Sequence, residues 1–145
     1  MTYRILSEKD KRIFKAMGQG IIPRGGRHFE LGAIDLAEKW LPRTDYLLSR
    51  MNRVSRTGFR LLIRGINLLW PLFYLKRFHQ MTALSEEELV LLFHRVESSN
   101  ALSAAVILFI KVLICPPFYG LEEVKAAISY REKFPNPKEY EGLKA

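Results

Sequence analysis

Apolar residues recur at helical spacing along most of the chain, and no strand-like alternation of apolar and polar residues is present. Ser7, followed by an acidic stretch, predicts the start of a helix that runs to about Gln19. Gly18, Gly20 and Pro23 predict its end, because glycine and proline interrupt helices. The first segment of the chain is therefore expected to be one capped, amphipathic helix.

The middle of the chain predicts two further helices. One covers about 29–40 and is expected to stop at Pro42, which cannot donate a backbone hydrogen bond. The next covers about 46–69, and either Thr44 or Asp45 can serve as its N-terminal cap. Together they extend the helical pattern to the aromatic segment that follows.

The second half of the chain begins with a clear helix start. Ser85 and Glu88 have the spacing of a capping box. The residues of 101–115 are apolar on nearly all sides, which predicts a central buried helix. Prolines at 116–117 are expected to end it, and 121–128 can form a short helix.

These elements predict an all-α protein with a single domain. We expect a helical bundle of about five to seven helices over residues 1–130 and an extended polar tail over 131–145. The apolar run 101–115 contains Lys111 and is shorter than the ~20 residues that a membrane-spanning helix needs. No apolar signal-peptide core precedes the first helix, so we expect the cytoplasm or the cytoplasmic face of the membrane, with export only alongside a partner.

Composition adds a basic charge and little chemistry. The formal net charge is +8, which favours anionic partners such as lipid, nucleic acid or an acidic protein. Cys115 is the single cysteine, and its place in an apolar run predicts burial as a small hydrophobe. His28, His79 and His94 are not spaced as metal ligands. We therefore expect no catalytic, cofactor-binding or metal-binding residue in this chain.

Arginines follow one side of the helix predicted at 46–69. They recur every three or four residues and share about a third of the helix circumference. The arginines that we expect at a contact surface are Arg53, Arg56, Arg60 and Arg64. They can bind the phosphates of lipid or nucleic acid, or an acidic protein. The alternative is a solvated helix face, and no nucleic-acid-binding motif surrounds the stripe.

An aromatic and basic segment follows this helix and includes Pro71, where a bend or end of the helix is expected. Its aromatic residues are Trp70, Phe73, Tyr74 and Phe78. Flanked by Lys76 and Arg77, this group resembles the anchor of a membrane-surface protein. Ordinary core packing at a helix junction is the alternative interpretation.

Two sets of short motifs resemble a known family. LSEKD at 6–10 and GIIP at 20–23 resemble the start of the gluconate 2-dehydrogenase subunit 3 family, the small helical partners of flavin-dependent glucose-methanol-choline oxidoreductases. LSEEE at 84–88, FIK at 109–111, FYG at 118–120 and ISY at 128–130 are similar to the N-terminal helical region of long-chain alcohol oxidases. The twin-arginine export signal of many family members and the flavin domain of those oxidases are absent here.

The resemblance implies a non-catalytic small subunit of a flavin-dependent alcohol dehydrogenase or oxidase. The FAD and the catalytic residues would belong to the large partner subunit. This chain would stabilise that subunit and dock it to a membrane or to a lipophilic substrate. The alternative is a free-standing basic helical module that binds anionic lipid or nucleic acid, and a stand-alone enzyme is the third reading.

Overall fold

The computed structural model describes residues 3–26 and 29–128. Over these residues the chain forms six α-helices, one 3-10 turn and no strand, which confirms the all-α prediction. The elements are α1 (Glu8–Ile21), α2 (Ala37–Ser49), α3 (Arg53–Leu75), η1 (Met81–Ala83), α4 (Glu86–Ser99), α5 (Ala101–Tyr119) and α6 (Glu122–Ala127). The tail predicted for 131–145 lies outside the described residues.

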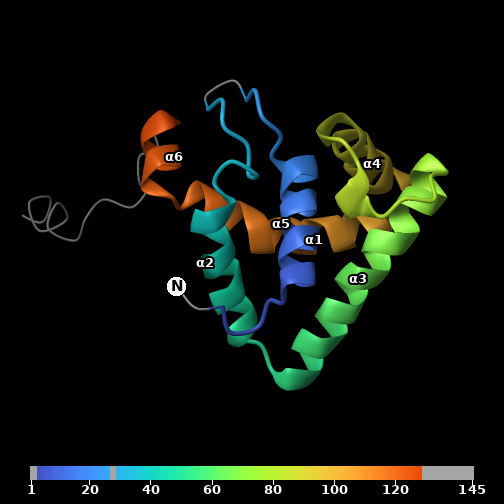
Figure 1. Cartoon of the computed structure of the whole chain (residues 1–145), viewed down its shortest axis with the longest axis horizontal. Helices are drawn as coiled ribbons and strands as arrows, with labels where there is room; N and C mark the ends of the chain where they lie inside the picture. Colours follow the sequence, from blue (N-terminus) through green and yellow to red (C-terminus); the bar gives the residue numbers. More distant parts are fainter. Residues whose placement is uncertain (1–2, 27–28, 129–145) are drawn as a thin grey trace, which may run out of the picture.

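Helices α2 and α3 form the two arms of a V that closes at the short turn between them (Figure 1). Helix α1 stands between the arms, and α5 crosses behind it. The main packing partners of α1 are α4 and α3, whereas α5 packs against α4 and α2. Segments far apart in the sequence therefore enclose one hydrophobic core around α1.

Helix α1 packs closely because of two glycines in its last turns. Gly18 and Gly20, predicted to end this helix, lie inside it and are buried. A Cβ atom on Gly18 would lie 3.0 Å from the Cβ atom of Ala33, and one on Gly20 would overlap the ring of Phe93. The missing side chain of Gly20 lets α1 approach Phe93 of α4, and that of Gly18 leaves room for Ala33 and for Trp40 of α2.

Polar side chains start four of the helices as cap residues. The hydroxyl of Ser7 accepts a hydrogen bond from the backbone N–H of Asp10, and that of Ser85 accepts one from the N–H of Glu88, each at 3.3 Å. Both predicted capping boxes are present. Two asparagines cap α3 and α5 in the same way: Asn52 and Asn100. The beginnings of these helices are local features of the sequence.

The boundaries of α2 and α3 differ from the prediction. The helix expected at 29–40 begins later and runs through Pro42 to Ser49 as α2. The helix expected over 46–69 is divided at residues 50–52, and α3 then continues past Pro71 to Leu75. Thr44 and Asp45, predicted as caps, lie buried inside α2 instead.

Asp45 is buried because it binds a distant part of the chain. Its carboxylate accepts hydrogen bonds from the backbone N–H groups of Arg4, Ile5 and Leu6 at 2.8–2.9 Å. A carboxylate that receives three such bonds is well satisfied away from water. This contact, made across some forty residues, replaces the capping role that local spacing suggested.

Thr44 is buried for a related reason. Its hydroxyl donates a 2.8 Å hydrogen bond to the backbone carbonyl of Leu113 in α5. Pro117 has no N–H, so in the i to i−4 pattern this carbonyl lacks its helical partner. Thr44 supplies the missing donor, which allows α5 to continue through the two prolines that were expected to end it.

Helix α5 is not the fully buried helix that its apolar sequence predicted. One side of it packs on α2 and α4, with Ile107, Ile110 and Ile114 fully buried. The other side leaves large apolar residues uncovered, among them Leu102 at 76% and Leu108 at 64% exposure. An apolar helix that is covered on one side only presents a surface that water solvates poorly.

Candidate partner-binding surface

The predicted arginine stripe of α3 divides into two halves with different surroundings. Arg60 and Arg64 bind the carboxylate of Asp10, with N–O distances of 2.8 Å and 3.0 Å. Asp10 is fully buried, and its carboxylate also accepts a hydrogen bond from the hydroxyl of Ser7 at 2.8 Å. These two half-buried arginines therefore hold α3 against the start of α1.

The ionisation of Asp10 reflects these contacts. Burial raises the pKa of this carboxyl group, but hydrogen bonds from Arg64, Ser7 and Arg60 act in the opposite direction and outweigh it. The pKa of Asp10 is consequently held below its ordinary value. The carboxylate stays charged at neutral pH and keeps both arginines in place.

The other half of the stripe has no such contact. Arg53 is exposed and Arg56 is half-buried, and neither forms an ion pair with a carboxylate of the described residues. Sequence spacing placed all four arginines on one arc but could not separate these two from Arg60 and Arg64, because Asp10 lies about fifty residues away.

The predicted aromatic anchor divides in the same manner. Trp70 packs edge-on against Phe93 with ring centres 5.9 Å apart. The hydroxyl of Tyr74 lies 3.2 Å from the hydroxyls of Ser99 and Ser103. Both aromatic side chains thus help to join α3 to its neighbouring helices.

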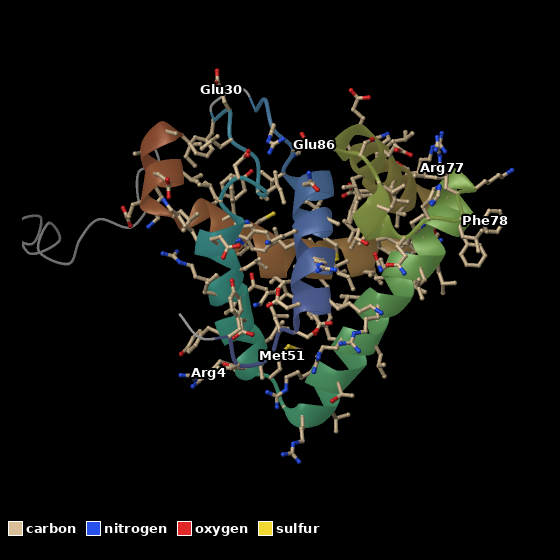
Figure 2. The ribbon with its side chains drawn as sticks, in the orientation of Figure 1. Arg4, Glu30, Met51, Arg77, Phe78 and Glu86 are labelled. Atoms are coloured by element: carbon tan, nitrogen blue, oxygen red, sulfur yellow. The ribbon has the colours of Figure 1, made fainter. Side chains whose placement is uncertain are left out.

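Two of the aromatic residues point away from the fold. Phe73 is 69% exposed and Phe78 is 91% exposed. Figure 2 shows the ring of Phe78 projecting from the outer side of the molecule, beside Arg77. Helix α3 ends at Leu75. The next residue, Lys76, has a φ of 53°, which turns the chain ahead of Phe78. These two rings are available for contact.

We call the exposed apolar residues of α3 and α5 together the α3–α5 face. Contacts between the helices join its two parts, since the rings of Phe59 and Phe109 lie 5.3 Å apart and Tyr74 bonds to Ser103. The large exposed side chains of this face are Leu61, Leu62, Leu68, Leu69, Phe73, Leu102, Leu108, Phe109 and Val112.

A groove of about 630 Å³ follows the α3 part of this face. Gly58 and Gly65 lie seven residues apart along it, and a Cβ atom on either would meet nothing within 4 Å. Large apolar side chains border these glycines, including Leu62 and Leu69. The groove is a shallow apolar trough of the kind in which a helix can pack.

The helices α3 and α5 themselves carry charge of one sign. The sequence contains no acidic residue between Asp45 and Glu86, and none between Glu97 and Glu122. Helices α3 and α5 therefore carry only basic or neutral side chains. The basic residue of α5, Lys111, binds Glu97 at 2.8 Å. The face suits a partner that is apolar at its centre and acidic at its edge.

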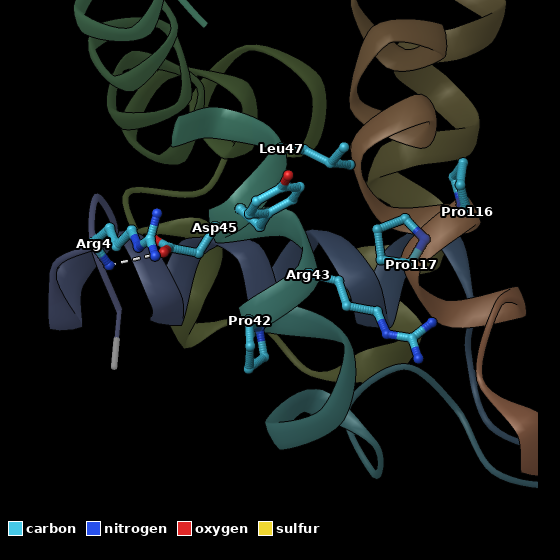
Figure 3. Close-up of a pocket in the computed structure, with 8 residues that line it drawn as sticks. Arg4, Pro42, Arg43, Asp45, Leu47, Pro116 and Pro117 are labelled. Atoms are coloured by element: carbon cyan, nitrogen blue, oxygen red, sulfur yellow. Dashed lines mark hydrogen bonds between the residues drawn. The ribbon is translucent and has the colours of Figure 1, made fainter. Parts of the chain in front are cut away.

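A second cavity lies between α2 and the end of α5 (Figure 3). Its volume is about 770 Å³. The residues that line it are Arg4, Pro42, Arg43, Asp45, Tyr46, Leu47, Pro116 and Pro117. Sequence analysis did not predict this cleft, because its walls come from three separate segments of the chain.

The groups that could support catalysis or bind metal are dispersed. Among the described residues no three histidine, cysteine or acidic side chains gather closely enough to hold a metal ion. His79 and His94 are exposed, and His28 lies outside the described residues. Cys115 is half-buried, and burial raises the pKa of its thiol although Lys111 acts in the opposite direction.

Within the described part of the chain, α5 is a helix long and apolar enough to cross a membrane by length and composition. It has 19 residues, four more than the run 101–115 contains. A third of the apolar window is buried against the rest of the fold. Core helices of soluble proteins share this length and apolar composition.

The chain was compared with protein-family models, curated proteins and solved structures, and no match was found in any of the three.

Proposed function

We propose that this protein is a non-catalytic helical subunit that binds and stabilises a larger protein through its α3–α5 face. The observation that carries the proposal is the row of large apolar side chains that α3 and α5 leave uncovered. Monomeric proteins rarely expose contiguous apolar surface beyond a few hundred Å², and larger patches usually mark an interface.

The sequence resemblance supports a partner of one class. The motifs at 6–10 and 20–23 resemble the small subunits of glucose-methanol-choline oxidoreductases. We therefore propose that the partner is the FAD-containing large subunit of an alcohol dehydrogenase or oxidase. In this complex the flavin and the reacting groups belong to the large subunit, and the present chain covers its apolar surface.

The test is co-expression with a flavoprotein of this class encoded next to the gene for this chain. We expect a stable complex that shows flavin absorbance, whereas the chain alone self-associates. Leu62→Glu should weaken the complex about a hundredfold, because it places a charge inside an apolar interface. The matched control is Leu91→Glu on α4, since Leu62 and Leu91 are both 42% exposed.

Light scattering and pull-down measurements decide the outcome. Equal binding by the wild type and the Leu62→Glu variant would show that the α3–α5 face is not the interface. A monomeric chain that captures no flavoprotein would contradict the proposed function as a whole.

The basic rim of the face favours one second candidate, a free-standing module on anionic lipid. Arg53 is exposed at one end of α3, and Phe73 and Phe78 are exposed at the other. Basic and aromatic residues in this arrangement are typical of proteins that lie on a membrane surface. Sedimentation with vesicles that contain phosphatidylserine, but not with neutral vesicles, would support this candidate.

A further inference from the structure

We propose that the cleft between α2 and the end of α5 binds a single-chain anionic amphiphile, a molecule with one alkyl chain and a carboxylate or phosphate head. This inference is independent of the proposed function, because the cleft is formed by other residues than the α3–α5 face. It gives the chain a ligand of its own.

The size of the cleft favours a small molecule over a protein side chain. Its volume of about 770 Å³ falls within the ~300–1,000 Å³ that is usual for ligand pockets. A single inserted side chain would leave most of this volume empty. Pro42 of α2 and Pro116 and Pro117 of α5 supply rigid apolar walls, and Leu47 extends them (Figure 3).

The cleft is held in shape by hydrogen bonds behind its walls. Asp45 fixes the N-terminal segment through the backbone N–H groups of residues 4–6. Thr44 joins α2 to α5 through the carbonyl of Leu113. A pocket that already has its shape requires little ordering when a ligand enters, which favours binding.

The charge of the cleft selects an anion. Arg4 and Arg43 line it, both are exposed, and neither forms an ion pair with a described carboxylate. The carboxylate of the cleft, on Asp45, is occupied by three backbone donors. Two guanidinium groups therefore outnumber one satisfied carboxylate, and each can bind a carboxylate or phosphate with two hydrogen bonds.

The positions of the two arginines suit an amphiphile. In Figure 3 the side chain of Arg43 extends along α5 toward its end, whereas Arg4 lies beside Asp45 on the other side of the cleft. The guanidinium of Arg43 reaches the backbone at Gly120, since a Cβ atom there would lie 3.1 Å from its Nη1. Charge thus lies at the edges and apolar surface at the centre.

The experiment is isothermal titration of the full-length chain, in the oligomeric state in which it purifies, with dodecanoate, dodecyl phosphate and dodecanol. Each ligand is used below the concentration at which it aggregates. We expect one dodecanoate or dodecyl phosphate per chain and binding of dodecanol at least about tenfold weaker. The stronger of the two anions identifies the head group, a fatty acid or a phosphate-headed lipid.

Variants locate the binding. Arg43→Gln should weaken binding of the anion about tenfold, and Leu47→Trp should block it by filling the cleft. The control for charge is Arg50→Gln, an exposed arginine that follows α2 and does not line the cleft. The control for shape is Leu61→Trp on the α3–α5 face. Circular dichroism of every variant checks that the helices are retained.

Three results would overturn the proposal. The first is equal binding of dodecanol and dodecanoate, and the second is loss of binding in Leu61→Trp but not in Leu47→Trp. The third is a chain that binds none of the three ligands while Arg43→Gln prevents capture of the flavoprotein, which would make the cleft a protein contact. The comparison of Leu62→Glu with Leu91→Glu tests the α3–α5 face separately.

Discussion

At the scale of single residues, Asp10 is a buried carboxylate on which two arginines depend for their ion pairs. It lies fully buried between two arginines and the helix cap of α1. Asp10→Ala removes the partner of both guanidinium groups, and we expect the free energy of unfolding to fall by about 2–4 kcal/mol. Urea unfolding at one fixed protein concentration measures the change. Glu8→Ala, an exposed residue of the same turn, should have little effect.

The same carboxyl group makes stability depend on acid. Its pKa is lower in the folded state than in the unfolded chain. The stabilisation is therefore complete above the unfolded pKa of ~3.9 and declines as the pH falls from there through the folded pKa. Asp10→Asn should flatten this acid limb of the stability curve, and an unchanged acid limb would show that Asp10 does not control it.

At the scale of helices, substitutions at two glycines distinguish a covered helix face from an open one. Gly20 contacts Phe93, so Gly20→Ala should destabilise the fold by about 1–3 kcal/mol through overpacking of α1 against α4. Gly58 faces open space in the middle of α3, so Gly58→Ala should stabilise the isolated chain by about 0.5–1 kcal/mol. Thermal unfolding of the two variants compares them directly, and destabilisation by both would mean that the groove of α3 is filled.

Helix α3 also shows how a single sequence stripe can serve two purposes. Its four arginines share one arc, but only Arg60 and Arg64 lie beside α1 and meet Asp10. Arg53 and Arg56 lie nearer the start of α3, at the closed end of the V, which extends beyond the start of α1 in Figure 1. The position of α1 along α3, rather than the spacing of the arginines, separates the two pairs.

At the scale of the whole molecule, this division predicts two different outcomes from the same chemical change. Arg53→Gln with Arg56→Gln should lower the salt dependence of association with an anionic partner and leave unfolding unchanged. Arg60→Gln with Arg64→Gln should lower the stability instead, because Asp10 loses its ion pairs. Binding measured across a salt titration and urea unfolding separate the two. Identical behaviour of both double variants would contradict the division.

The α3–α5 face is likewise a property of the whole molecule. Helix α5 is apolar on nearly every side, and α2 and α4 cover only part of it. Sequence analysis predicted complete burial because an apolar surface is stable only when covered.

The sequence by itself determined where α1 and α4 begin, because a cap is a contact between a side chain and a backbone group three residues away. Ser7 and Ser85 illustrate this. It also determined the all-α class, because helical spacing of apolar residues is a local pattern. Phe73 and Phe78 are exposed, and the role of their segment as a contact surface stays a prediction.

Only the tertiary structure decided how far the helices run and which residues remain exposed. Pro42 lies inside α2 and Pro117 inside α5, where Thr44 donates a hydrogen bond to the carbonyl of Leu113. Asp45 accepts hydrogen bonds from the N-terminal segment and does not cap a helix. Each outcome depends on a group that is distant in the chain, and the free energy of such a contact is absent until the fold brings the two groups together.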